Sequence, residues 1–256
     1  MQIVSLITDY GTQDYYLAEL KTAIYRRAGI VQLLDVSHRV ESHDISTAAY
    51  FLENIIQKLP KGSIHIVSVN NYYIKKPDFL VFKHTDQYFV GPDNGLFSLV
   101  FEDFEQQELF KIEGVKHQIS DLKELYAHTV ASIVHGFPLS EIGNLHTTPT
   151  LKLKIRPVIN SDHVRATIIH IDHYENVIIN LKKEDFMRLR NGRSFYLYYK
   201  QHDPISQISN HYADVPTGEV LCRFNSMGYL ELAINMGRAA SMLNLAKNET
   251  IQIDFR

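Results

Sequence analysis

Carboxylates and amides at the ends of predicted strands are the side chains of this sequence best suited to hold a ligand. Asp9 follows the apolar run 3–8, and Asp93 and Asn94 lie in the turn "GPDNG". An ionised carboxylate only accepts hydrogen bonds, so Asp9 could bind two neighbouring hydroxyls of a ribose. Asp9 could equally cap the helix that follows it, and Pro-Asp-Asn-Gly is a favoured composition for a plain tight turn. The residue types alone leave both interpretations open.

Two similar groups of polar residues occur in the second half of the chain. Asp172 and Asn176 belong to "DHYEN", and Asn225 and Ser226 belong to "FNSMG". Each group lies where one strand pattern stops and the next begins, so each could contact a ligand or could simply form a turn. No group is specific by itself, but their order along the chain is.

Metal and nucleophile chemistry find little support in the sequence. In "HIDHY", strand alternation would place His170 and Asp172 on one face and His173 on the other. A metal site needs three or four converging ligands, and the chain has no HExxH or CxxC spacing, so we expect no metal. Cys222 lies inside the apolar run "VLCRF", where a lone cysteine is usually a small core residue. The sequence also lacks the G-x-G-x-x-G, Walker and G-x-S-x-G motifs.

The elements that must position these residues alternate between strand and helix in the first half of the chain. Such alternation predicts a mixed, mainly parallel sheet with helices on both faces. Gly29 lies where a helix C-terminal glycine would, and Asp44 or Ser46 could cap the second helix. The predicted strands are 3–8, 31–38, 63–69, 78–84 and 87–95, and the predicted helices are 14–29, 44–62 and 122–136.

The pattern changes near residue 150. The segment 148–157 is extended, and the rest of the chain is rich in strand-like runs separated by turns, with helical character only in "RAASMLNL". We therefore predict an α/β domain over residues 1–150 and an all-β, barrel-like domain over residues 151–256.

Composition narrows the classes of function. The chain has 256 residues, a net charge of −3 and a pI near 6.5, which argues against a general nucleic-acid binder. No apolar stretch reaches the roughly 18–20 residues that a membrane helix needs. The start "MQIVSLITDYG" lacks the features of a signal peptide, and the single cysteine favours a reducing compartment. We expect a cytoplasmic protein that binds neither nucleic acid nor membrane.

A series of motifs along nearly the whole chain is similar to one family. The series runs T-D-Y-G, D-V-S-H, D-I-x-x-A-A, G-P-D-N-G and I-D-x-Y-x-N, and ends in N-S-x-G-Y-L-E-L-A-x-N-x-G-x-A-A-x-x-L over 225–243, its most specific part. It resembles the S-adenosyl-L-methionine (SAM) hydroxide adenosyltransferases, also called SAM hydrolases, a family that includes the fluorinases and chlorinases.

The resemblance implies a fold, an assembly and a ligand. It implies an N-terminal α/β domain, a C-terminal β-barrel-like domain, and a homotrimer that holds SAM between the N-terminal domain of one subunit and the C-terminal domain of a neighbour. Asp9 would match the acid that grips the ribose hydroxyls. The residues Asp172, Asn176, Asn225 and Ser226 would match barrel residues that face the adenine and the methionine end. SAM or adenosine is then a ligand, and no separate cofactor is expected.

The departures from the family fall where its chemistry should be. Without gaps, the family's catalytic acid falls on Asn70, its arginine on Pro77, and its histidine, in the segment aligned with 119–124, on Asp121. Bulky Tyr72 and Ile74 replace glycines, so a smaller or reshaped pocket is expected. A glutamate, Glu175, also stands where the family has a glycine.

These replacements lead to three hypotheses. The first is a divergent member with an adenosyl or nucleoside pocket and weak or absent hydrolysis of SAM, since Asn70 cannot accept a proton near neutral pH and Pro77 has no donor. The second is an active enzyme with a rebuilt site that uses Asp121 as base and Lys75 or Lys76 as cation. The third is a non-catalytic nucleoside sensor or interaction module. Whether Tyr72 and Tyr73 fill or line the pocket is part of the same question.

Overall fold

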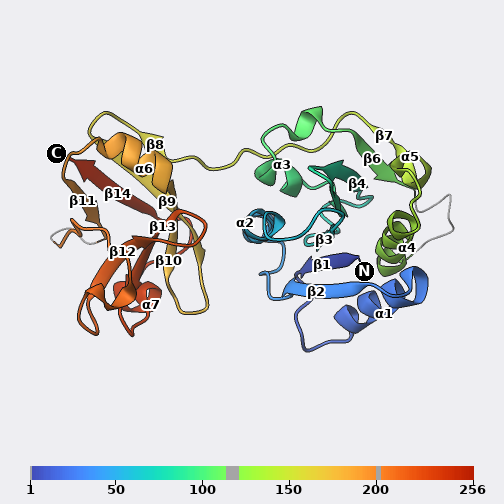
Figure 1. The fold of residues 1–256 in the computed structure, drawn as a ribbon, viewed down its shortest axis with the longest axis horizontal. Coiled ribbons are helices and arrows are strands. Elements are labelled where there is room, and N and C mark those ends of the chain that lie inside the picture. The colour runs from blue at the N-terminus through green and yellow to red at the C-terminus, as the bar shows by residue number, and fades with distance from the viewer. Residues whose placement is uncertain (1, 114–120, 200–202) are drawn as a thin grey trace. The chain divides into compact units, whose positions relative to one another are not determined.

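A computed structural model divides the chain into two compact units, residues 1–154 and 155–256 (Figure 1). The structure describes residues 2–113, 121–199 and 203–256. The change of sequence pattern predicted a boundary between the two units near residue 150. Each unit has its own buried apolar core, with two clusters in the first unit, one on each face of its sheet, and one cluster in the second.

The first unit is built on a seven-stranded mixed sheet with the strand order β2-β1-β3-β5-β4-β6-β7. The neighbours β1 and β2, β1 and β3, and β3 and β5 run parallel, whereas β4 and the strands beyond it pair antiparallel. The predicted mixed α/β sheet is thereby confirmed. The strands are β1 (Ile3–Thr8), β2 (Gln32–Ser37), β3 (Ile64–Ser68), β4 (Phe79–His84), β5 (Gln87–Pro92), β6 (Leu109–Ile112) and β7 (Gly143–His146).

Helices cover both faces of this sheet (Figure 1). Side chains alternate between the faces of a strand, so Leu6 packs with α1 and α4 while Ile7 packs with α2 and α3. The helices are α1 (Tyr16–Ala28), α2 (Ile45–Ile56), α3 (Leu96–Val100), α4 (Leu122–Val134) and α5 (Leu139–Ile142), with a 3₁₀ turn at Phe104–Gln106.

Local signals set the helix ends. Asp44 caps α2 by accepting a hydrogen bond from the Thr47 amide at 3.1 Å. Gly29 ends α1 with a φ of 70°, a conformation that favours glycine. The helix α1 begins after Tyr15 without a side-chain cap, so the interpretation of Asp9 as its N-cap is wrong.

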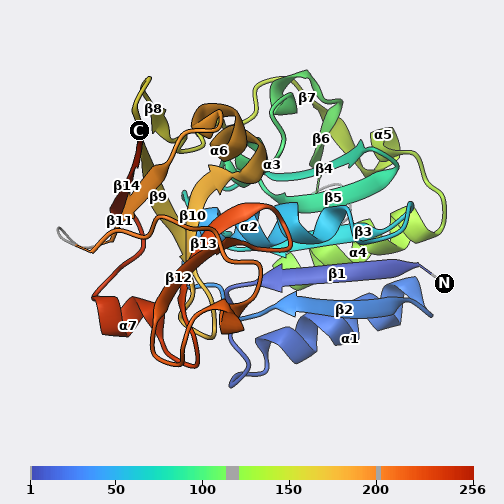
Figure 2. The ribbon, with the colours of Figure 1, turned by 60° about the vertical axis from the view of Figure 1, so that its left-hand side comes forward.

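The second unit is a curled antiparallel sheet with the order β11-β14-β9-β10-β13-β12, and β8 pairs with β9 (Figure 2). Its β-rich, half-barrel character confirms the predicted class. A helix that the sequence did not predict, α6 (Lys183–Arg190), follows β10; its only buried residue is Phe186. The other elements are β8 (Val158–Ile159), β9 (His163–Ile171), β10 (Val177–Lys182), β11 (Phe195–Tyr198), β12 (Val220–Phe224), β13 (Tyr229–Ile234), α7 (Ala239–Leu243) and β14 (Thr250–Phe255).

Within the described ranges, the search for a helix that could cross a lipid bilayer found none of sufficient length and apolar character.

Candidate functional site

The strand order of the first unit marks one edge of the sheet as a place for a ligand. The chain passes from β1 through α1 to β2 on one side of β1, and then through α2 to β3 on the other side. The helices α1 and α2 therefore lie on opposite faces of the sheet, and the loops that lead into them, after β1 and β2, diverge. In open α/β sheets a crevice forms at such a switch point, outside the carboxyl ends of the strands. Asp9 directly follows β1, and Asn70 follows β3.

The Asp9 carboxylate is held by main-chain amides from the neighbouring loops. Its Oδ2 accepts a hydrogen bond from the Asn70 amide at 3.0 Å and lies 3.4 Å from the His43 amide, which also donates to it. Both donor residues adopt positive φ angles, 52° at Asn70 and 70° at His43. These bonds use Oδ2 and leave Oδ1 for other partners. The arrangement suits a carboxylate that must be fixed in orientation before it meets hydroxyl groups; contact with a ribose remains a prediction.

Asn70, the position that aligns with the family's catalytic acid, is fixed on several sides. Its Oδ1 lies 3.0 Å from Nδ1 of His43, and its carbonyl accepts a hydrogen bond from Asn94 at 3.2 Å. An amide cannot serve as a general base near neutral pH. At this position the side chain therefore tethers the loop after β2 to the loop after β3.

Asn94 and Asp93, both predicted to contact a ligand, hold loops of the first unit. Asn94 is 3% exposed, and its Nδ2 also donates to the Val69 carbonyl at 3.0 Å. The Asp93 carboxylate is 5% exposed, accepts a hydrogen bond from the Thr150 amide at 2.9 Å and lies 3.2 Å from Nε2 of His146. Burial raises the pKa of Asp93, while the bonds from Thr150 and His146 oppose that rise. The contact of either residue with a ligand stays a prediction.

A hydrogen-bonded chain of phenols and small polar groups lies beside Asp9, and the sequence analysis missed it. The Tyr10 hydroxyl lies 2.7 Å from Ser68 Oγ, and Ser68 Oγ accepts from Asn71 Nδ2 at 3.0 Å. The fully buried Tyr126 of α4 donates its hydroxyl proton to Asn71 Oδ1 at 2.8 Å. The available signal was a tyrosine on the apolar face of a predicted helix, whose hydroxyl needs a partner when buried.

Burial keeps these phenols neutral. It raises the pKa of Tyr10 to about 12, although the hydrogen bond with Ser68 acts in the opposite direction. The pKa of Tyr126 also lies well above its usual range because the ring is buried. The negative charge of Asp9 raises both pKa values further. These side chains can therefore donate hydrogen bonds at the switch point of the sheet, but the two phenols cannot act as a general base.

The two bulky residues predicted to replace glycines of the family do not form part of the core of the first unit. Tyr72 is 76% exposed and Ile74 is 54% exposed. Tyr73 is half-buried; burial raises its pKa, and its hydroxyl interacts with Asp78 and Thr150. Tyr73 is thus attached to the segment that follows β7, whereas Tyr72 is available to contact a ligand.

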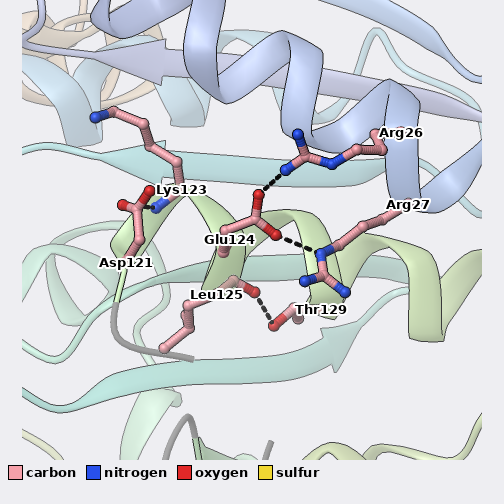
Figure 3. Close-up of polar contacts among 7 residues, drawn as sticks. All are labelled: Arg26, Arg27, Asp121, Lys123, Glu124, Leu125 and Thr129. Atoms are coloured by element: carbon pink, nitrogen blue, oxygen red, sulfur yellow. Dashed lines mark hydrogen bonds and ion pairs between the residues drawn. The ribbon is translucent and has the colours of Figure 1, made fainter. Parts of the chain in front are cut away.

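The proposed replacement base, Asp121, caps α4. Its Oδ1 accepts a hydrogen bond from the Lys123 amide at 3.1 Å (Figure 3). Lys75 and Lys76 are exposed, and between residues 2–113 and 121–134 no hydrogen bond or ion pair joins either lysine to Asp121. Pro77 is half-buried. The first two residues of the segment aligned with the family histidine, Ile119 and Ser120, lie outside the described residues.

Asp172 and Asn176 form one self-contained turn between β9 and β10. Asp172 Oδ1 accepts from the amides of Tyr174 at 2.9 Å and Asn176 at 2.8 Å, and Oδ2 accepts from Asn176 Nδ2 at 3.0 Å. The strand β9 ends at Ile171, so the alternation expected to carry His170 and Asp172 on one face stops before Asp172.

Asn225 and Ser226 form another turn, at the opposite end of the same strand pair. Asn225 Oδ1 accepts from the amides of Met227 and Tyr229, both at 3.0 Å, and Ser226 is exposed. The antiparallel strands β10 and β13 pair Val177 with Leu232 and Lys182 with Tyr229. The two turns are therefore about 17 Å apart at roughly 3.3 Å per residue. Within one chain, the two predicted groups cannot contact the same atom of a ligand.

Glu175, predicted to stand where the family has a glycine, adopts a left-handed backbone conformation. Its φ is 63°. Its Oε2 accepts from the Ser241 amide at 3.1 Å, Arg238 lies 3.4 Å from Oε1, and its carbonyl accepts from the Ala240 amide at 2.9 Å. The hydrogen bonds from Ser241 lower the pKa of this carboxyl. Glu175 thus joins the turn after β9 to α7.

The His, Cys, Asp and Glu side chains of the described residues form no metal site, and the single thiol is buried. Across the described ranges, no three His, Cys, Asp or Glu side chains converge as metal ligands would. Cys222 is buried, donates to the Gln207 carbonyl at 3.3 Å, and has a pKa raised to about 12 by burial. A thiol held in that protonated form is a core group and a poor nucleophile.

Comparison with known proteins relates both units of the chain to one family. The family model described as SAM hydroxide adenosyltransferase N-terminal domain matches residues 4–143, and the C-terminal domain model matches residues 166–252. An "(R)-S-adenosyl-L-methionine hydrolase" of Methanocaldococcus jannaschii is 25% identical, with 100% of this chain and 97% of the relative covered. A "Fluorinase" of Actinoplanes sp. is 21% identical, with 98% and 97% covered. A crystal structure of an uncharacterised conserved protein from Thermotoga maritima matches with a TM-score of 0.85 at 24% identity, with 98% and 99% covered, which establishes the fold alone.

Proposed function

Since the chain belongs to the SAM hydroxide adenosyltransferase family, we propose that it binds SAM or adenosine at the carboxyl edge of the first unit and hydrolyses SAM weakly or not at all. One observation carries this proposal. The amides of Asn70 and His43 orient the Asp9 carboxylate, while the Asn70 side chain, at the catalytic position, is an amide.

The binding half of the proposal rests on preorganisation. Two main-chain amides hold Asp9 before any ligand arrives, so little orientation is lost when a diol binds. Tyr72 is exposed, follows Asn70 by two residues, and offers a ring at the same edge. As in the family, we propose that the site is completed by the barrel of a neighbouring subunit in a homotrimer. The compartment we propose is the cytoplasm, where the single cysteine stays reduced.

The chemical half rests on what the site lacks. Water that attacks C5′ of SAM must be oriented and lose a proton, and positioned acid–base groups contribute about 100- to 10,000-fold to such steps. Asn70 and Pro77 supply neither a base nor a cation. Asp121 caps α4 through Oδ1, and no bond connects it with Lys75 or Lys76 among the described residues. The geometry therefore favours binding over a rebuilt hydrolytic site.

The first experiment measures turnover and binding on the same protein. Purified protein is incubated with SAM, adenosine is measured by chromatography, and thermal shift is recorded with SAM and with adenosine. We expect a higher melting temperature with ligand, since binding to the native state stabilises it, and little or no adenosine formed. Robust turnover would overturn the inactive interpretation, and loss of that turnover in Asp121→Ala or Lys75→Ala would establish the rebuilt site.

A gain-of-function variant sharpens the test. Asn70→Asp places a carboxylate at the family's acid position, beside the histidine that Asn70 now contacts. Because the partners at Pro77 and Asp121 are still missing, we expect a rise in hydrolysis that stays below the roughly 100-fold supplied by one complete acid–base group. Asn248→Asp, the same change at an exposed amide of the second unit, is the matched control and should leave turnover unchanged. An increase in both variants would show that the added charge, and not its position, matters.

A further inference from the structure

A basic hollow lies on the first unit, away from Asp9. It has a volume of about 520 Å³ and is lined by the last turn of α1, the second half of α4 and the residues that follow α4. The helix α1 starts at the carboxyl edge of the sheet and ends before β2 begins, so its 13 residues separate the hollow from Asp9 by about 20 Å. The lining residues that matter are Arg26, Arg27, His128, Ser132, His135 and Phe137.

The two arginines of the hollow share one carboxylate. Glu124 forms ion pairs with Arg26 through Oε1 and with Arg27 through Oε2, the latter at 2.5 Å (Figure 3). The guanidinium side chains are 63% and 38% exposed, and none of the described residues that line the hollow is acidic. Two cations against one anion leave a net positive charge next to the cavity. A single guanidinium group can bind a phosphate through two parallel hydrogen bonds.

The α4 side of the hollow adds hydrogen-bonding side chains that lie on one face of the helix. His128, Ser132 and His135 are spaced four and three residues apart, so they lie on one face of the helix and its cap. The chain then turns at Gly136, with a φ of 81°, and Phe137 follows with 52% of its surface exposed. An exposed ring beside cationic and hydroxyl groups is what a ligand with both a phosphate and a flat ring needs.

We infer that this hollow binds a small phosphorylated ligand of the nucleoside monophosphate class. The phosphate contacts Arg26, Arg27 and the hydroxyl of Ser132, and the ring lies against Phe137. The volume falls within the range of about 300–1,000 Å³ typical of small-molecule sites. Glu124 competes with the phosphate for both arginines, so it limits the affinity.

Because Glu124 competes with the phosphate, substitutions of Arg27 and of Glu124 should change the affinity for the ligand in opposite directions. Full-length protein is titrated calorimetrically with adenosine 5′-monophosphate, and in parallel with inorganic phosphate and adenosine. We expect Arg27→Gln to weaken binding of the monophosphate by about tenfold or more, the loss of one charged hydrogen bond. Glu124→Gln should strengthen it several-fold by releasing both guanidinium groups. Inorganic phosphate should follow the same pattern with lower affinity because it lacks the ring.

Controls separate the hollow from the Asp9 site and from misfolding. Arg188→Gln removes an exposed arginine of α6 in the second unit and should change nothing. Ser132→Ala, a small change on α4, should weaken binding even if Arg27→Gln lowers the melting temperature. No binding at millimolar monophosphate, equal affinity in all variants, or loss of inorganic phosphate binding in Asp9→Asn would overturn the inference. Asp9→Asn should weaken the binding of adenosine, and of any monophosphate held by its ribose at the first site, and should leave the binding of inorganic phosphate unchanged.

Discussion

The candidate ligand residues of the two units are held in different ways. Asp9 is bound by amides 34 and 61 positions away in the sequence, which three different loops bring together. Asp172 is bound by groups at most four positions away, within its own turn. The fold positions the first carboxylate, and a local turn positions the second. Substitution of Asp9 should therefore affect ligand binding most, and substitution of Asp172 should affect the stability of its own unit.

The largest expected effect is on the binding of SAM or adenosine in Asp9→Ala. The change removes the acceptor for the ribose hydroxyls and leaves the amides of Asn70 and His43 without their acceptor. With about 1.5–3 kcal/mol for each hydrogen bond to a charged group, affinity should fall by 100-fold or more. Isothermal titration calorimetry measures the loss.

Asp172→Ala is the matched control for that experiment. The protein with this substitution should still bind ligand at its first unit. An equal loss of affinity in both variants would contradict the contrast between the units and would show that the turn after β9 also contacts the ligand.

The second largest expected effect is a loss of stability of the first unit at acid pH, which the second unit should not share. His65 of β3 is fully buried, with Nδ1 2.7 Å from Ser5 Oγ and Nε2 3.3 Å from Gln87 Oε1. Burial lowers its pKa from 6.5 to about 4, although the Gln87 bond opposes this. Between those values the unfolded chain binds a proton that the folded protein does not. The stability contributed by the neutral ring is therefore fully present above pH 6.5 and is lost as the pH falls toward 4, about 3 kcal/mol in all at about 1.4 kcal/mol per pKa unit.

Hydrogen exchange between pH 7 and pH 4.5 checks this prediction strand by strand, after correction for the intrinsic exchange rate. Amides of β3 should lose protection relative to those of β9 as the pH falls. The loss should be absent in His65→Gln and present in His173→Gln, which changes an exposed histidine of the second unit. Equal loss of protection in β3 and β9 would mean that other groups control acid unfolding.

Much of the fold follows from local patterns, as three helices show. The apolar spacing of α1, α2 and α4 is visible in the sequence, and Gly29 and Asp44 mark their ends as predicted. The strands β6 and β7 were not predicted because each has only four residues and is defined by pairing with distant strands. The helix α6 was missed because its sequence is mostly charged and it buries only Phe186.

The site could be predicted only in part, for a related reason. A carboxylate after the first strand is a local feature, so Asp9 was found. The amides that hold Asp9 come from residues with positive φ angles in two other loops, and no sequence pattern specifies that asparagine and histidine adopt this conformation there. The series of side-chain hydrogen bonds from Tyr10 to Tyr126 depends on the packing of α4 against the loop after β3. Only the tertiary structure determines that packing.

The third effect is on the stability of the second unit in Asp172→Ala. The substitution removes three accepted hydrogen bonds of 2.8–3.0 Å that close the turn between β9 and β10. Because the freed amides at this turn can bind water, we expect a loss of about 2 kcal/mol, less than the sum of three charged bonds. Urea unfolding followed by hydrogen exchange in β9 and β10 measures it. Asp162→Ala removes an exposed carboxylate whose Oδ1 lies 2.9 Å from Nδ1 of His163, and it should leave the midpoint of urea unfolding nearly unchanged.

The smallest effect tests whether the long-range network behind Asp9 reaches the ligand. Tyr126→Phe deletes one hydroxyl that donates to Asn71 Oδ1 at 2.8 Å and leaves the ring in the core. We expect a loss of about 1 kcal/mol in stability, because Asn71 Oδ1 keeps only the longer contact with Ser68 Oγ at 3.3 Å. The amides of Asn70 and Asn71 should exchange faster, and adenosine affinity should fall a few-fold, because Asn70 donates to Asp9. Tyr25→Phe, on an exposed tyrosine of α1, should change neither quantity. If Tyr126→Phe lowers stability but leaves affinity unchanged, the network supports the core alone, and the Asp9 carboxylate is oriented by its two amide contacts without help from α4.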